Sequence, residues 1–117
     1  MTEIAIDELA GRLGEVAIVD VRTLGEYDGS AGKPCDPRQG HIPGARHLDV
    51  YALLEMPTGD VHSALGLAEG AEVVAYCHSG SRSAIAARVF QSLGYDARNY
   101  VGSWHEWSRH DDLPVES

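Results

Sequence analysis

One short segment of the chain joins a cysteine to residues that could activate it. Cys77 is followed by His78, Ser79, Gly80, Ser81, Arg82 and Ser83. Small polar residues and a glycine allow backbone N–H groups and hydroxyls to converge on one atom, and such a cradle favours the nucleophilic thiolate. The same cradle would hold the charge of a terminal persulfide sulfur. We interpret Cys77 as a reactive thiol, since a merely buried thiol would not need Gly80 and Arg82 so close behind it.

The elements around this segment predict where it lies. Residues 73–76 form a short apolar run typical of a buried strand, and residues 83–93 carry apolar side chains at helical spacing. Together they place Cys77 at the carboxyl end of a parallel strand, the edge at which open α/β sheets bind ligands. The positive end of the helix dipole lies there too. We therefore expect the pKa of Cys77 to lie below the free-thiol value of about 8.5.

Strand and helix patterns alternate along the rest of the chain. Strand patterns cover residues 4–6, 17–21, 45–48, 73–76 and 97–101, and helical patterns cover residues 8–13, parts of 49–70, 83–93 and the region of 104–107. Residues 29–44 are rich in Gly, Pro and Asp, which predicts a long surface loop. The alternation predicts an α/β domain with a mainly parallel sheet. The chain shows no internal repeat or low-complexity segment, so we expect one domain.

The formal net charge of -9 narrows the classes of partner. Such a charge repels nucleic acid and anionic membrane surfaces, so we expect neither as a partner, and any anion site must be built locally. No apolar run approaches the roughly 20 residues of a membrane span, and the first residues lack a secretory signal pattern. We therefore expect a cytoplasmic protein. The two cysteines, Cys35 and Cys77, form no C-x-x-C pair, and in such a compartment they are expected to be free thiols.

Several motifs stand in an order and spacing that carry a family resemblance. They are Asp20-Val21-Arg22, Gly40-His41-Ile42-Pro43-Gly44-Ala45, Cys77-x-x-Gly80-x-Arg82-Ser83, Leu93-Gly94-Tyr95 and Gly102-Ser103-Trp104. In this order they resemble the rhodanese family over nearly the whole chain, to about residue 107. The segments Glu26-Tyr27-x-Gly29 and Gly102-Ser103-Trp104-x-Glu106-Trp107 are most similar to the second half of tandem thiosulfate sulfurtransferases.

The resemblance implies a fold and an extent. The fold is a rhodanese-like α/β fold, with a central, mainly parallel five-stranded sheet flanked by helices on both faces. Residues 1–117 are expected to form a single rhodanese domain. Met1 favours a complete protein, whereas the likeness to one half of a tandem enzyme leaves a longer protein open.

The resemblance also implies a reaction. Cys77 would take the outer sulfur of a sulfane donor, thiosulfate or a persulfide, and would pass it from a Cys77 persulfide to a thiol or cyanide acceptor. A sulfur-carrying protein is an alternative partner. This covalent catalysis needs no metal and no organic cofactor.

Two other functions compete with this one. Cysteine-based phosphatases and the related arsenate reductases place five residues between cysteine and arginine, whereas four separate Cys77 from Arg82. The tighter loop suits a single sulfur better than a tetrahedral oxyanion. A non-catalytic rhodanese-like binding module usually loses the cysteine or the loop, and this chain retains both.

The other loop residues each have a binding and a structural interpretation. Arg82 could grip the sulfonate of a donor, or it could pair with an acid such as Asp20. Ser81 and Ser83 could donate to the persulfide or cap the helix. His78 would flank the mouth of the pocket, with a solvent-facing side chain as the default.

Residues outside the loop are expected to support the loop or to influence which sulfur donor it accepts. Asp20 and Arg22 are expected to form an ion pair that locks loops together, and His41 to organise its turn. The best-known thiosulfate enzymes of the family hold a donor-gripping arginine where this chain has Glu26, and a lysine where it has Ser79. These departures, with the acidic net charge, favour a persulfide or a sulfur-carrying protein as a serious alternative to thiosulfate.

Cys35 offers a second thiol. With His41, His47 and His62 it matches no standard zinc spacing, so we expect no metal site. Cys35 could instead resolve the persulfide or take its sulfur, but a spectator cysteine in a surface loop is the favoured interpretation.

Overall fold

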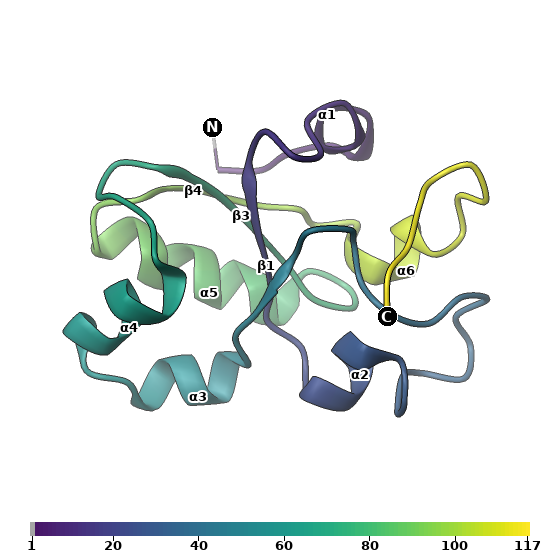
Figure 1. The fold of residues 1–117 in the computed structure, drawn as a ribbon, viewed down its shortest axis with the longest axis horizontal. Helices are drawn as coiled ribbons and strands as arrows, with labels where there is room; N and C mark the ends of the chain where they lie inside the picture. The colour runs from purple at the N-terminus through teal and green to yellow at the C-terminus, as the bar shows by residue number, and fades with distance from the viewer. Residues whose placement is uncertain (1) are drawn as a thin grey trace.

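The computed structural model describes residues 2–117 and builds them around one parallel sheet (Figure 1). The strands are β1 (Ala17–Asp20), β2 (Arg46–His47), β3 (Glu72–Tyr76) and β4 (Asp96–Asn99). They are ordered β2-β1-β3-β4, and each neighbouring pair is parallel. The register aligns Asp20 with Tyr76 and Ala75 with Asn99, so the carboxyl ends of three strands meet at one edge. The predicted parallel α/β sheet is confirmed.

The prediction of five strands is wrong, because the described residues form four. The strand expected at residues 4–6 is reduced to a single parallel bridge between Glu3 and Asn99. The backbone N–H of Ile4 still donates to the Asn99 carbonyl at 3.1 Å, but helix α1 (Ile6–Ala10) begins only two residues later. The helix expected at residues 8–13 therefore starts earlier than its pattern indicated, and it leaves no length for a strand.

Helices cover both faces of the sheet, as the resemblance implied. After α1 come α2 (Leu24–Asp28), α3 (Val50–Glu55), α4 (Thr58–Leu65), α5 (Ser81–Ser92) and α6 (Ser103–Trp107). One buried cluster joins α3, α4 and α5 to the sheet, and the other joins α1 and α6 to the opposite face. Figure 1 shows α3, α4 and α5 gathered at one end and α6 at the other.

Strand β3 divides its side chains between these two clusters. Val73 and Ala75 belong to the cluster of α3, α4 and α5, whereas Val74 and Tyr76 belong to the cluster of α1 and α6. This alternation is what a strand with helices on both faces requires, because successive side chains point to opposite sides. The strand is thereby held on both faces up to the residue before Cys77.

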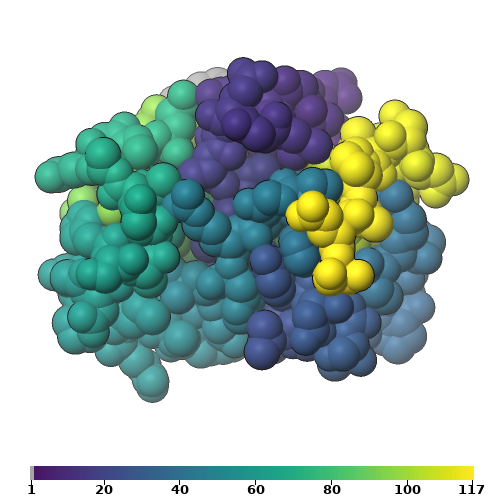
Figure 2. All heavy atoms as spheres, viewed as in Figure 1, coloured from purple at the N-terminus to yellow at the C-terminus, as the bar shows by residue number. Residues whose placement is uncertain are grey.

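The C-terminal segment closes the molecule against the long loop of residues 29–44. His41 and Glu116 form an antiparallel bridge, in which each backbone N–H donates to the other's carbonyl, at 2.7 and 2.9 Å. Figure 2 shows this C-terminal segment, in yellow, lying on the blue residues of the first half of the chain. None of the helices in residues 2–117 combines the length and apolar character needed to cross a membrane.

Candidate active site

Cys77 lies directly after β3, and its sulfur is surrounded by hydrogen-bond donors. The residue is fully buried. Its Sγ accepts from the backbone N–H of Gly80 at 3.1 Å and from the backbone N–H of Ser83 at 3.4 Å. The hydroxyl of Ser83 donates to the same atom at 3.3 Å. These three donors converge on one sulfur, and the hydroxyl of Ser103 lies 4.0 Å from it.

These donors are available because a helix leaves its first N–H groups unpaired. Ser83 is the third residue of α5, and Gly80 is its N-cap, which has no side chain to cap it. Gly80 adopts a left-handed φ of 96°, and an added Cβ would lie 2.7 Å from the carbonyl oxygen of Val101. Only glycine fits that backbone comfortably. The sulfur of Cys77 therefore takes the place of a capping side chain.

The same contacts shift the ionisation of the thiol. Burial alone raises the pKa of Cys77, because it disfavours the charged form. Hydrogen bonds from the hydroxyl and N–H of Ser83, and from the N–H groups of Gly80 and Ser79, outweigh this effect. The pKa of Cys77 therefore lies below its ordinary value, as its position at the helix N-terminus led us to expect.

The side chains of Ser83 and Ser81 lie in different environments. The Ser83 hydroxyl points at Cys77 Sγ, whereas Ser81 is exposed on the first turn of α5. Ser79 is exposed as well, although its N–H contributes to the environment of the sulfur. Of the three serines, only Ser83 offers its side chain to the thiolate.

Ser103, to which the sequence patterns gave no role, forms a hydrogen bond with the backbone of Cys77. The hydroxyl of Ser103 accepts from the backbone N–H of Cys77 at 3.0 Å and donates to the carbonyl of Tyr100 at 2.8 Å. Ser103 is buried and has a φ of 55°. Ser103 belongs to the motif Gly102-Ser103-Trp104, but its contact with Cys77 depends on a backbone geometry that no spacing predicts.

Arg82 pairs with an acid, the second of its two interpretations, and that acid is Glu26. Its Nη1 lies 2.9 Å from Glu26 Oε1, and its Nη2 donates to Oε2 at 3.2 Å. Asp20, the acid named as an example, is instead engaged by Arg22. The guanidinium of Arg82 is thus held on the side of the loop by Glu26, which lies in α2.

Asp20 and Arg22 form the buried ion pair that was expected. Their closest atoms are 2.7 Å apart, and both side chains are almost fully buried. Arg22 also donates to the carbonyl of Gly40 at 2.6 Å, and Asp20 accepts from the hydroxyl of Tyr76 at 2.7 Å. The guanidinium lies over the ring of Trp104, 5.0 Å from its centroid. This pair ties the end of β1 to the turn at Gly40 and to β3.

His41 organises its turn, as the pattern indicated. Its Nδ1 donates to the carbonyl of Tyr27 at 2.7 Å, and the two rings stack with centroids 3.8 Å apart. Its Nε2 lies 3.7 Å from a carboxylate oxygen of Glu116. These contacts serve the loop and the C-terminal segment rather than Cys77.

His78 is not the solvent-facing side chain that we took as the default. Its side chain is 13% exposed, and its Nε2 lies 3.0 Å from Oδ2 of Asp36. Arg109 holds the other oxygen of the same carboxylate at 3.0 Å. Asp36 belongs to the long loop and is 42 residues from His78, so no local pattern pointed to it.

The cysteine and histidines considered for a metal are dispersed. His47 contacts the carbonyl of Arg22, and His62 contacts the hydroxyl of Tyr95. Another set, formed by Cys35, Asp36 and His78, offers ligand atoms within 4.8 Å of one another. The guanidinium of Arg109 and the ring of His78 already lie against the two oxygens of Asp36, each at 3.0 Å. We therefore assign no metal ligand from these residues, and the expectation of a site without metal stays a prediction.

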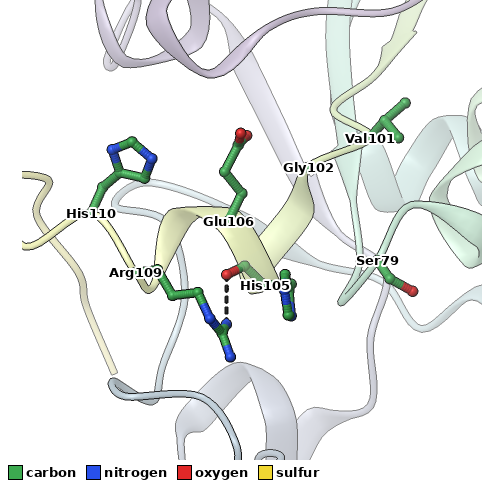
Figure 3. A pocket seen from close by; sticks show the side chains of 7 residues that line it. All are labelled: Ser79, Val101, Gly102, His105, Glu106, Arg109 and His110. Carbon is green, nitrogen blue, oxygen red and sulfur yellow. Dashed lines mark hydrogen bonds between the residues drawn. The ribbon is translucent and has the colours of Figure 1, made fainter.

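A cavity of about 450 Å³ opens beside the loop (Figure 3). It is lined by Ser79 of the loop and by residues of α6 and its flanks, including Gly102, His105 and Arg109. Figure 3 shows Arg109 bent back so that it reaches the backbone of His105, to which it donates at 2.6 Å. The cavity gives a small molecule room next to the loop that carries Cys77.

Comparison with known proteins places this geometry in a family. The family model described as the rhodanese-like domain matches residues 5–110. A thiosulfate sulfurtransferase of Azotobacter vinelandii is 36% identical over 121 residues, which cover 94% of this chain and 44% of that protein. A sulfur carrier protein of Thermus thermophilus is 35% identical over 119 residues, covering 87% of this chain and 41% of that protein.

A solved structure agrees with this match. The crystal structure of a probable thiosulfate sulfurtransferase superposes with a TM-score of 0.85 at 42% identity, over 98% of this chain and 47% of that one. The chain therefore spans less than half the length of each of these three proteins.

Proposed function

This chain belongs to the rhodanese family, and we propose that it is a sulfurtransferase that carries sulfane sulfur as a persulfide on Cys77. The convergence of three hydrogen-bond donors on Cys77 Sγ carries the proposal. A buried sulfur in a purely structural role would gain nothing from donors that lower its pKa. Relatives that are named thiosulfate sulfurtransferase and sulfur carrier protein support the same reaction class.

The proposed cycle has two steps. In the first, the Cys77 thiolate attacks the outer sulfur of the donor; with thiosulfate, the S–S bond breaks and sulfite leaves with the electron pair. In the second, an acceptor thiolate or cyanide attacks the outer sulfur of the persulfide and restores the Cys77 thiolate. The donors around Sγ stabilise negative charge on the thiolate and on the persulfide.

The proposed roles of the surrounding residues follow from their contacts. Ser83 and Gly80 hold the charge of the sulfur directly. Asp20, Arg22 and His41 act through the shape of the neighbouring loops. Thiosulfate or a persulfide is the proposed donor, and a thiol, cyanide or a sulfur-carrying protein the proposed acceptor. We also propose that residues 1–117 act as a single domain, and a cytoplasmic location stays a prediction.

Intact-mass measurement tests the proposal directly. The protein is incubated with thiosulfate, or with an alkyl persulfide, and its mass is recorded before and after cyanide or dithiothreitol is added. We expect a gain of one sulfur atom that the acceptor removes. Cys77→Ala should abolish the adduct, and Cys35→Ala is the matched control that should retain it.

Two outcomes would contradict the proposal. The first is a folded protein that gains no sulfur from either donor; turnover of an aryl phosphate by that sample would favour the phosphatase instead. The second is an adduct that survives Cys77→Ala and disappears with Cys35→Ala, which would assign the sulfur to the other thiol.

A further inference from the structure

Asn99 is a buried side chain on β4 that reaches the Cys77 loop. Its Nδ2 donates to the carbonyl of Gly80 at 3.1 Å, and the side chain belongs to a residue that is only 8% exposed. In the parallel register, Asn99 lies opposite Ala75 of β3, two residues before Cys77. The two strands therefore bring the amide and the cysteine to the same edge of the sheet.

The oxygen of this amide has no hydrogen-bond partner among the described residues. A carbonyl only accepts hydrogen bonds, so the NH2 group of Asn99 must be the half that faces Gly80. Asn99 Oδ1 is left buried and unsatisfied as a result. An unsatisfied buried oxygen destabilises a fold, and an apolar side chain of similar size would avoid that cost. Stability alone therefore does not explain an asparagine at this position.

Gly80 is a residue whose position matters for the sulfur. Its N–H donates to Cys77 Sγ at 3.1 Å, and such a bond weakens steeply when the N–H turns away from its acceptor. Glycine has the freest backbone of all residues, and Gly80 has no side chain with which to cap α5. From α5, the N–H of Ala84 donates to the Gly80 carbonyl at 3.0 Å. Asn99 adds a second donor to the same carbonyl from outside the helix.

The backbone of Asn99 is itself held on both sides of β4. Its N–H donates to the carbonyl of Thr2 at 2.8 Å, and its carbonyl accepts from the N–H of Ile4 at 3.1 Å. On the other side, the N–H of Tyr100 donates to a carbonyl of β3 at 2.9 Å. The amide therefore acts on Gly80 from a fixed support, which is what precise positioning of a site requires.

We infer that Asn99 is a positioning residue for the proposed sulfur transfer, because its amide fixes Gly80 so that the Gly80 N–H stays directed at Cys77 Sγ. This inference rests on the proposed sulfurtransferase function. Asn99 acts on the sulfur through two consecutive hydrogen bonds. The second of them, from Gly80, is among the contacts that lower the pKa of Cys77, so the ionisation of the thiol gives a readout that needs no sulfur donor.

Asn99→Leu tests the inference, because it removes the donor and the unsatisfied oxygen together. The substitution is made in a Cys35→Ser protein, so that iodoacetamide reports on Cys77 alone. We expect the pH midpoint of alkylation to rise by about half a unit, since the thiolate loses part of its stabilisation. Sulfur loading from thiosulfate at neutral pH should slow by roughly twofold or more. The urea midpoint should not fall, because no buried oxygen is left unsatisfied at this position.

A second variant and a matched control separate positioning from stability. Asn99→Ala also removes the donor but leaves empty space, so it should raise the alkylation midpoint as Asn99→Leu does and also lower the urea midpoint. Gln91→Leu is the control, because Gln91 Nε2 donates to the carbonyl of Ala97 at 2.9 Å and so makes a similar link between α5 and β4. Gln91 lies in the last turn of α5, at the opposite end from Cys77, so this substitution should leave the alkylation midpoint and the loading rate unchanged.

The outcomes separate this inference from the function on which it rests. If both Asn99 variants are alkylated and loaded as the unsubstituted protein is, or if Gln91→Leu changes Cys77 equally, the inference is wrong and the sulfurtransferase stands. A slower reaction that appears only in Asn99→Ala, together with its loss of stability, would assign Asn99 a purely structural role and would also overturn the inference. If no donor loads Cys77 in the unsubstituted protein, the proposed function itself fails, whatever the alkylation midpoints show.

Discussion

The hydroxyl of Ser103 accepts a hydrogen bond from the backbone N–H of Cys77 at 3.0 Å and thereby joins Cys77 to the start of α6. The carbonyl of Cys77 is held as well, because the N–H of Trp104 donates to it at 2.9 Å. Ser103 adopts a left-handed φ of 55°, which is unfavourable for a residue other than glycine. The unfavourable backbone is retained because it brings both polar groups of Cys77 into hydrogen bonds with adjacent residues of α6.

Ser103→Ala should destabilise the fold and slow sulfur loading. It leaves the buried N–H of Cys77 without a partner, which costs about 1–3 kcal/mol of unfolding free energy. Urea denaturation measures the loss of unfolding free energy. The rate at which iodoacetamide alkylates Cys77 shows whether the Cys77 loop has changed. Ser108→Ala is the control, since Ser108 is also buried but its hydroxyl has no hydrogen-bond partner among the described residues. Equal destabilisation by both substitutions would contradict the assigned role of Ser103.

Gly80→Ala should damage the cradle of Cys77 more than its backbone angle alone explains. A left-handed φ costs a residue other than glycine about 1–2 kcal/mol, and at Gly80 the added Cβ would also lie 2.7 Å from the Val101 carbonyl. Gly14 offers a matched site, with a φ of 82° and open space where the Cβ would go. Gly14→Ala should therefore lower stability only by the backbone amount. The Gly80→Ala protein should be destabilised more than this and should form the persulfide more slowly. Equal destabilisation of the two variants, with unchanged persulfide formation, would show that the Val101 contact is unimportant.

The Cys77 loop could be predicted from sequence because its chemistry is local. The sulfur, Gly80 and Ser83 lie within seven residues, and a strand followed by a helix fixes their arrangement. The ion pair of Asp20 and Arg22 could also be predicted, since only one residue separates them at the end of β1. Patterns over a short stretch were sufficient in both cases.

Contacts between residues that are far apart in the sequence could not be predicted. Glu26 is 56 residues from Arg82, and Asp36 is 42 residues from His78. Only the packing of α2 and of the long loop against the Cys77 loop brings these pairs together. The prediction of a fifth strand was wrong for a different reason. Two apolar residues at the N-terminus fit a strand or a helix equally well, and Ile6 is the first residue of α1.

Removal of the Asp20 carboxylate should be one of the most damaging single changes in the protein. Asp20→Ala leaves the buried guanidinium of Arg22 without its counterion and the hydroxyl of Tyr76 without its acceptor. Breaking a buried ion pair in this way costs about 3–5 kcal/mol. Glu72→Ala is the control, because Glu72 pairs with Arg12 at 2.8 Å on the surface, where such pairs contribute little.

The urea midpoints of the two variants test this difference in stability. We expect a large decrease for Asp20→Ala and almost none for Glu72→Ala. A decrease of similar size in both would show that the buried pair is no more important for stability than the exposed one.

The ionisation of Cys77 should depend on the hydroxyl of Ser83. Iodoacetamide alkylation of a Cys35→Ser protein should titrate below the free-thiol value of about 8.5, because the pKa of Cys77 is lowered. Ser83→Ala removes the side-chain donor at 3.3 Å and should move the midpoint to higher pH. Ser81→Ala, on the same turn but exposed, is the control that should leave it in place.

The same shift predicts how stability depends on pH. Between the lowered pKa of folded Cys77 and about 8.5, the unfolded chain holds a proton that the folded chain has released, so the free energy of unfolding rises with pH across this interval. The contribution is complete above the unfolded pKa and is lost as the pH falls through the folded one. Urea denaturation at a series of pH values should show this rise in the Cys35→Ser protein and not after Cys77→Ala is added. A rise of equal size in both proteins would assign it to another group, and an alkylation midpoint at or above that of a free thiol would show that the donors around Sγ do not stabilise the thiolate.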